Sequence, residues 1–105
     1  MTVEMGIRHR ESGEYEVVPV ATTETFRTLW CPAAERLGLK LVPLFSGGAL
    51  TSVPADLIPQ IIAEVMTLQQ WAATQPDEAY LVDRCTGILS AFERTDPSKC
   101  DYDFG

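Results

Sequence analysis

The chain has 105 residues, of which 46% are hydrophobic and 22% are charged. This composition suits one folded domain with its own apolar core, and it excludes a disordered or a fibrous chain. The formal net charge of −7 argues against direct binding to nucleic acid phosphates or to an anionic membrane surface.

The first predicted element is a β-hairpin over residues 2–10 and 15–21. Apolar and polar residues alternate in its first strand, which is typical of a strand with one buried and one solvated face. Residues 11–14 contain the turn formers between the strands. Pro19 in the second strand predicts a bulge or a position at the edge of the sheet.

An amphipathic helix is predicted next, beginning at the hydroxyls of Thr22 and Thr23 and ending at Gly38. Its apolar residues recur at helical spacing: Phe26, Leu29, Trp30, Ala33, Ala34 and Leu37. Pro32 lies inside this helix and predicts a kink or a division, because proline removes a backbone hydrogen bond.

The middle of the chain predicts a buried strand over residues 39–45 and a turn at Ser46-Gly47-Gly48. The next helix begins between Ser52 and Pro59 and runs to about Gln75. It carries a broad apolar stripe of Leu57, Ile58, Ile61, Ile62, Val65, Met66, Leu68 and Trp71.

A third helix follows a short break at residues 75–78, with Asp77 as its expected N-cap. Its apolar residues again have helical spacing: Leu81, Cys85, Ile88, Leu89 and Phe92. So short a connection predicts that the last two helices pack as an antiparallel pair. Acidic and aromatic side chains alternate within residues 100–105, and residues 97–105 are predicted to form either a flexible tail or an edge strand.

These elements follow one another in the order β-β-α-β-α-α, with a further short strand at the end as an option. This order indicates a single α+β domain over residues 1–105. We expect a two-layer arrangement, in which a small and mostly antiparallel sheet packs against three helices.

The cysteines indicate a reducing compartment. Cys31, Cys85 and Cys100 are odd in number, and the N-terminus lacks the apolar run of a secretory signal, so we expect a cytoplasmic protein. Cys31 and Cys85 fall on apolar helix faces and should lie in the core, whereas Cys100 should be the exposed thiol. With no C-x-x-C pair and with His9 as the single histidine, we expect neither a metal nor another cofactor.

The sequence favours a protein without catalysis, and we assign no catalytic residue. The turn Ser46-Gly47-Gly48 is not a phosphate loop, because it lacks the further glycines and the Lys-Ser/Thr of that motif. His9 is the one imidazole available to a nucleophilic triad, and no serine lies in a G-x-S-x-G pattern. We therefore expect His9 to be a solvated strand residue.

The negative charge is uneven along the chain. Residues 1–52 hold six acidic and five basic residues, while residues 53–105 hold nine acidic and three basic residues. Such a field can attract a basic partner, with nearby aromatic side chains as anchors, or it can simply keep the surface solvated. The predicted partner-binding residues are Asp77, Glu78, Tyr80, Asp83, Asp96, Asp101, Tyr102 and Asp103.

The segment from Thr22 to Ala73 contains the stretches TFRTLW, PAAERLGLKLVPLF, SGG and PADLIPQIIAEVMTLQQWAA. It resembles small uncharacterised bacterial proteins, some of which are similar to the immunity proteins of toxin systems. The resemblance covers about half of the chain and consists of core-type residues. It implies a partner-binding role without carrying over any binding residue.

The leading hypothesis is a small acidic immunity or inhibitor protein that neutralises a basic partner such as a toxin or a nuclease. One alternative is a small enzyme or ligand-binding domain, with a pocket lined by His9, Arg10, Trp30 and Cys31 near the turn at residues 46–48. The other is a self-associating accessory protein, for example a homodimer, that uses an apolar patch around Trp71 or the unpaired edge of the hairpin.

Overall fold

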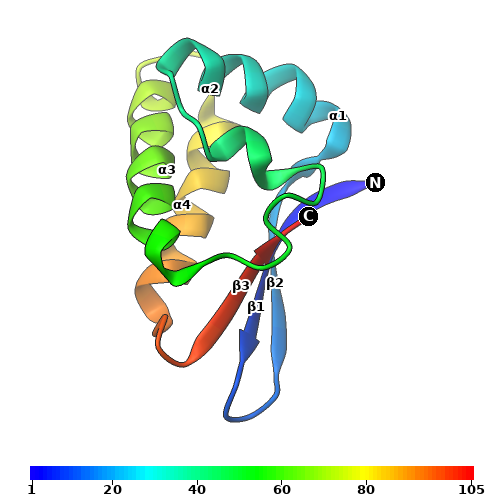
Figure 1. Ribbon diagram of the computed structural model, residues 1–105. Helices are drawn as coiled ribbons and strands as arrows, with labels where there is room; N and C mark the ends of the chain where they lie inside the picture. The colour runs from blue at the N-terminus through cyan, green and yellow to red at the C-terminus, as the bar shows by residue number, and fades with distance from the viewer.

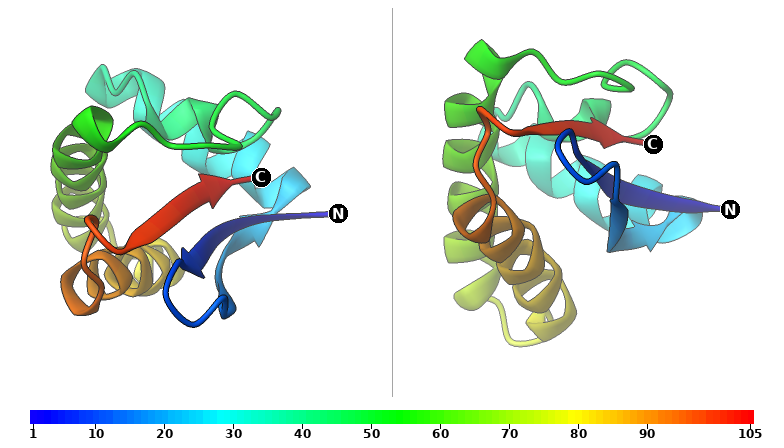
Figure 2. Two further views of the ribbon diagram at one scale, coloured as in Figure 1. Left: turned by 60° about the horizontal axis from the view of Figure 1, so that its bottom comes forward. Right: turned by 90° about the horizontal axis from the view of Figure 1, so that it is seen from below.

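The N-terminal hairpin forms as predicted in the computed structural model, which describes residues 1–105. Strand β1 spans Thr2–His9 and pairs antiparallel with β2, which spans Tyr15–Thr22. A third strand, β3 at Cys100–Phe104, pairs antiparallel with the other side of β1. The sheet therefore has the order β2-β1-β3, and the helices cover one of its faces (Figure 1, Figure 2).

The bulge expected near Pro19 is present. Val3 pairs with Ala21, but the next residue, Glu4, pairs with Pro19, so that Val20 is the extra residue of β2. Strand β2 also forms one edge of the sheet. A proline is tolerated here because an edge strand needs no outward N–H donor.

The C-terminal segment forms an edge strand, which was one of the two predicted outcomes. Cys100, Tyr102 and Phe104 point into the core, while Asp101 and Asp103 lie on the outer face of the sheet. Two expectations are therefore wrong. Cys100 is 4% exposed and Tyr102 is 2% exposed, because strand alternation turns both of them toward the helices.

The first predicted helix is divided ahead of Pro32, as expected. Helix α1 (Thr23–Thr25) continues into a π-helical turn at Phe26–Trp30, and then into α2 at Cys31–Leu37. The wide turn places Pro32 in the first turn of α2, where its missing N–H leaves no bond unmade. At the two ends, Thr22 accepts a hydrogen bond from the Thr25 amide and Gly38 adopts a left-handed conformation with φ +71°.

The strand predicted over residues 39–45 is wrong, since Val42–Phe45 forms a 3-10 helix. Its two buried side chains, Val42 and Phe45, stand three residues apart and suit one side of such a turn. The amides of Leu41 and Val42 donate to the carboxylate of Glu64 rather than to a neighbouring strand.

Two long helices complete the layer over the sheet. A short 3-10 turn at Ala55–Leu57 leads into α3 at Ile58–Ala73, and α4 spans Ala79–Arg94. They run antiparallel to one another, as predicted (Figure 1). The expected cap at Asp77 is wrong, because Glu78 precedes the helix and no side chain caps its first turn. None of the helices combines the length and apolarity needed to cross a lipid bilayer.

An aromatic cluster joins the elements at the centre of the core. The rings of Phe26 and Trp30 stack with centroids 5.7 Å apart, and Phe26 meets Phe45 at 6.4 Å. Phe45 in turn stacks on Phe104, with centroids 3.9 Å apart and planes within 4° of parallel. These ring contacts connect the π-helical turn at Phe26–Trp30, the 3-10 helix at Val42–Phe45 and strand β3.

The loop before α3 covers the outer edge of β3 (Figure 2). Gly47 and Gly48 take φ values of +96° and +84° in the predicted turn, a conformation that favours glycine. Beyond the turn, the Val53 amide donates to the Tyr102 carbonyl and the Phe104 amide donates to the Leu50 carbonyl. This edge of the sheet therefore has hydrogen-bond partners outside the sheet itself.

Candidate functional site

Four of the predicted partner-binding residues lie together where α3 turns into α4. We call Asp77, Glu78, Tyr80 and Asp83 the α4 N-terminal cluster. Asp77 and Asp83 are exposed, Glu78 is half-buried and the Tyr80 side chain is 39% exposed. Because Tyr80 and Asp83 stand three residues apart on α4, they occupy the same helix face.

Tyr80 is held in place from two sides. The Arg84 guanidinium lies 5.0 Å from the centre of its ring, and its hydroxyl donates to the Val20 carbonyl at 3.4 Å. A shallow hollow of about 150 Å³ lies beside the ring, between the start of α4 and the hairpin. The tyrosine is therefore a partly exposed aromatic side chain that is held in place by Arg84 and the Val20 carbonyl.

The remaining predicted acidic residues, Asp96, Asp101 and Asp103, lie elsewhere. Helix α4 ends at Arg94, so about 17 Å of helix length separates Asp96 from Asp83, the nearest member of the cluster. Asp96 accepts hydrogen bonds from the amide and the hydroxyl of Ser98, which hold the pKa of its carboxyl below the usual value. Asp101 and Asp103 lie on the outer face of the sheet, so the structure does not gather all the predicted residues into one surface.

The two outer-face carboxylates are engaged within the protein. Arg10 donates two hydrogen bonds to Asp101, which lowers the pKa of that carboxyl. The Tyr15 hydroxyl donates to Asp103 at 3.2 Å, directly above Gly6. A Cβ at Gly6 would lie 2.0 Å from that hydroxyl, so glycine leaves room for this contact.

Tyr102 does not belong to any surface. Its ring packs on Phe92 with centroids 5.0 Å apart, and its hydroxyl lies 2.7 Å from that of Thr95. Burial is the main reason that its pKa is raised above the usual value. It is a core residue and cannot anchor a partner in this conformation.

Few of the acidic side chains form ion pairs. Only two carboxylates lie within 4.0 Å of a basic group. Asp101 pairs with Arg10, and Glu16 pairs with His9 and Arg94. The carboxylates of the α4 N-terminal cluster have no basic partner at that distance. Asp77 and Asp83 are exposed, so their charge can act on an approaching molecule, whereas the half-buried Glu78 lines a hollow together with Arg36.

A second arrangement, which the sequence reading missed, surrounds His9 at the far end of the sheet. The Nε2 atom of His9 lies 2.6 Å from Glu16 Oε2, and its Nδ1 atom lies 3.4 Å from Cys100 Sγ. The other oxygen of Glu16 accepts a hydrogen bond from Arg94. We call Cys100, His9, Glu16 and Arg94 the His9 relay.

Each member of the relay comes from a different element. His9 is the last residue of β1 and pairs across the sheet with Cys100, the first residue of β3. Glu16 lies on β2 and Arg94 ends α4. His9 is half-buried and fully partnered, which corrects the expectation of a solvated strand residue. Its two ring nitrogens face opposite partners, so the thiol and the carboxylate do not converge as metal ligands would.

Glu16 provides a pH-dependent test of this arrangement. Hydrogen bonds from Arg94 and then His9 lower the pKa of its carboxyl from 4.5 to about 2. A carboxyl with a lowered pKa in the folded state stabilises the protein above its unfolded pKa, and this contribution is lost as the pH falls toward the folded value.

We therefore expect wild type to lose its stability advantage over Glu16→Gln as the pH falls from 4.5 to about 2. Urea unfolding of both proteins across this range measures the difference. A difference that stays constant with pH would contradict the assigned contacts.

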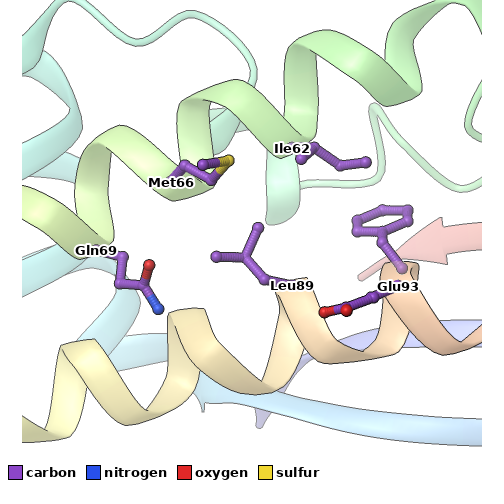
Figure 3. A pocket seen from close by; sticks show the side chains of 6 residues that line it. Ile62, Met66, Gln69, Leu89 and Glu93 are labelled. Atoms are coloured by element: carbon purple, nitrogen blue, oxygen red, sulfur yellow. The ribbon is translucent and has the colours of Figure 1, made fainter.

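An apolar groove separates α3 from α4 on the side away from the sheet (Figure 3). Its volume is about 310 Å³, with Ile62, Met66 and Leu89 facing one another between Gln69 and Glu93. Met66, expected in the buried stripe, is 44% exposed here. Trp71, the centre of the predicted self-association patch, is half-buried at the other side of α3 and does not line this groove.

The pocket predicted for an enzyme does not form. Trp30 is 0% exposed within the aromatic cluster, which reaches the sheet at Phe104 opposite Met5. His9 lies four residues further along β1, opposite Cys100. The residues of that prediction are therefore divided between the core and the end of the sheet.

Comparisons with protein-family models, with curated proteins and with solved structures find no match to this chain.

Proposed function

We propose that this protein is a non-catalytic binding protein that recognises a basic protein through the α4 N-terminal cluster. The observation that carries this proposal is a partly exposed aromatic ring, Tyr80, near the start of α4, with Asp83 on the same helix face and with Asp77 and Glu78 in the turn before it; none of these three carboxylates has a basic group within 4.0 Å. Immunity and inhibitor proteins of basic nucleases or toxins are the class that this surface suits.

The two kinds of side chain have different roles in this proposal. The carboxylates raise the rate at which a positively charged partner arrives and favour it over other proteins. Tyr80 supplies the contact that holds the partner, because buried tyrosines are among the residues that dominate interface energies. Its contacts with Arg84 and Val20 reduce the ordering that binding would require.

The test uses a panel of purified basic proteins, including nucleases, in kinetic binding measurements at low and at moderate salt. We expect at least one panel member to bind, with an association rate that falls as salt screens the charges. The triple variant Asp77→Asn, Glu78→Gln, Asp83→Asn should lower that rate by about tenfold. Tyr80→Ala should instead raise the dissociation rate by about tenfold or more and relieve inhibition of a bound nuclease.

A charge-matched control separates this surface from net charge alone. The variant Glu24→Gln, Glu35→Gln, Asp56→Asn changes the formal charge by the same amount, at exposed carboxylates that form no ion pair. It should retain nearly all of the association rate. The proposal fails if no basic protein binds, or if the control weakens binding as much as the triple variant does.

A further inference from the structure

The His9 relay places its groups in the order that activates a nucleophile. A thiol, an imidazole and a carboxylate follow one another, with Sγ to Nδ1 at 3.4 Å and Nε2 to the carboxylate at 2.6 Å. In such an order the imidazole takes the proton of the nucleophile, and the carboxylate orients the ring and stabilises its positive charge. Arg94 holds the far oxygen of Glu16 and so fixes the carboxylate in turn.

The other two thiols of the chain lack this environment. Cys85 is 0% exposed, and burial raises its pKa to about 12. Cys31 is half-buried in the first turn of α2, where burial also raises its pKa. Neither has a hydrogen-bond partner, whereas the Cys100 thiol lies 3.4 Å from His9 Nδ1, which is a proton acceptor when Nε2 donates to Glu16.

We propose that Cys100 is a reactive thiol of this protein, activated by His9, whose substrate class is small hydroperoxides. The 4% exposure of Cys100 admits only a small reactant, and no part of this inference depends on the binding function proposed above. It assigns a modification site to the end of the sheet opposite the α4 N-terminal cluster.

The reaction is a two-electron oxidation of the thiol. The Cys100 proton moves to His9 Nδ1 as the sulfur attacks one peroxide oxygen. An S–O bond forms, the O–O bond breaks, and the leaving oxygen takes up the proton held by His9. Cys100 becomes a sulfenic acid, and the hydroperoxide is reduced to water or to an alcohol.

The three cysteines provide an internal comparison. We expect limiting iodoacetamide at neutral pH, followed by site-resolved mass spectrometry, to modify Cys100 at least about tenfold faster than Cys31, although Cys31 is the more exposed thiol. If exposure alone decided reactivity, Cys31 would react first. That order in the wild-type protein would overturn the proposal.

Two variants connect the reactivity to the relay. His9→Asn should slow the modification of Cys100 by about tenfold or more and leave Cys31 unchanged, since general-base assistance is worth at least that much. Glu16→Gln keeps the imidazole of His9 and should slow the modification of Cys100 to a smaller extent. Cys85 reports on folding, because it should be modified only when the chain unfolds. Equal Cys100 rates in wild type and both folded variants would overturn the proposal.

Hydrogen peroxide tests the substrate class. The protein is treated with hydrogen peroxide while folded and then denatured in excess dimedone, which traps sulfenic acids. Dimedone should label Cys100 in wild type, much less of it in His9→Asn, and nothing at this position in Cys100→Ser. Wild-type protein that gives no dimedone adduct at Cys100 would overturn the assignment to hydroperoxides.

Discussion

Replacing Glu64 by alanine should lower the free energy of unfolding by about 3–5 kcal/mol. The Glu64 side chain is 7% exposed, and one of its oxygens accepts hydrogen bonds from the amides of Leu41 at 2.8 Å and Val42 at 3.0 Å. Its other oxygen accepts from Gln60. Alanine would leave two buried backbone donors without acceptors, and that desolvation cost is the main part of the effect.

Equilibrium unfolding in urea measures this loss, and two further substitutions interpret it. Glu64→Gln keeps one acceptor oxygen and should cost about 1–2 kcal/mol. Gln70→Ala lies on the exposed face of the same helix and should change stability by less than about 0.5 kcal/mol. A cost for alanine no larger than that for glutamine would contradict the role assigned to the carboxylate.

Replacing Phe104 by alanine should cost about 3–5 kcal/mol, although this residue is one position from the C-terminus. Its ring is 0% exposed and stacks on Phe45, and its amide donates to the Leu50 carbonyl. Removing the ring would open a cavity where the 3-10 helix and the sheet meet.

Thermal or chemical unfolding of Phe104→Ala and Phe104→Leu provides the measurement. Leucine retains much of the apolar volume of the phenylalanine ring. Phe104→Leu should therefore lower the free energy of unfolding by about 1–2 kcal/mol less than Phe104→Ala does. Asp101→Asn, on the outer face of the same strand, should cost less than about 1 kcal/mol because its ion pair is exposed. If alanine at Phe104 were as mild as this control, the C-terminal strand would not be part of the core.

Helical periodicity predicted the long helices correctly, because their apolar stripes continue over several turns and admit no other reading. The segment at residues 39–45 was read wrongly because a short apolar run suits a strand and a 3-10 turn equally well. The deciding contact comes from Glu64, which interrupts the apolar stripe of α3. An acidic residue on a buried face was the available signal for a partner in the core.

The two candidate sites also differ in how far the sequence could predict them. The residues of the α4 N-terminal cluster are close in sequence, so the charge count could include them, but it did not separate them from Asp96, Asp101 and Asp103, which lie elsewhere. The His9 relay depends on the pairing of His9 with Cys100, which are 91 positions apart. Sequence alone gives no register for such a pair. The alternation along β1 places His9 on the same face as Val3, Met5 and Ile7, a signal that the expectation of a solvated residue left unused.

Both edges of the sheet are obstructed over part of their length. On one side, the backbone of Leu50 and Val53 already occupies hydrogen-bonding positions of β3. On the other, Pro19 offers no N–H, a bulge interrupts β2, and Tyr80 bonds to the Val20 carbonyl. These features hinder the addition of a partner strand, and they hinder the edge-to-edge stacking of neighbouring copies that occurs in fibrils. Recognition through the side chains of the α4 N-terminal cluster would leave the backbone pairing intact, so surface substitutions alone could change its specificity.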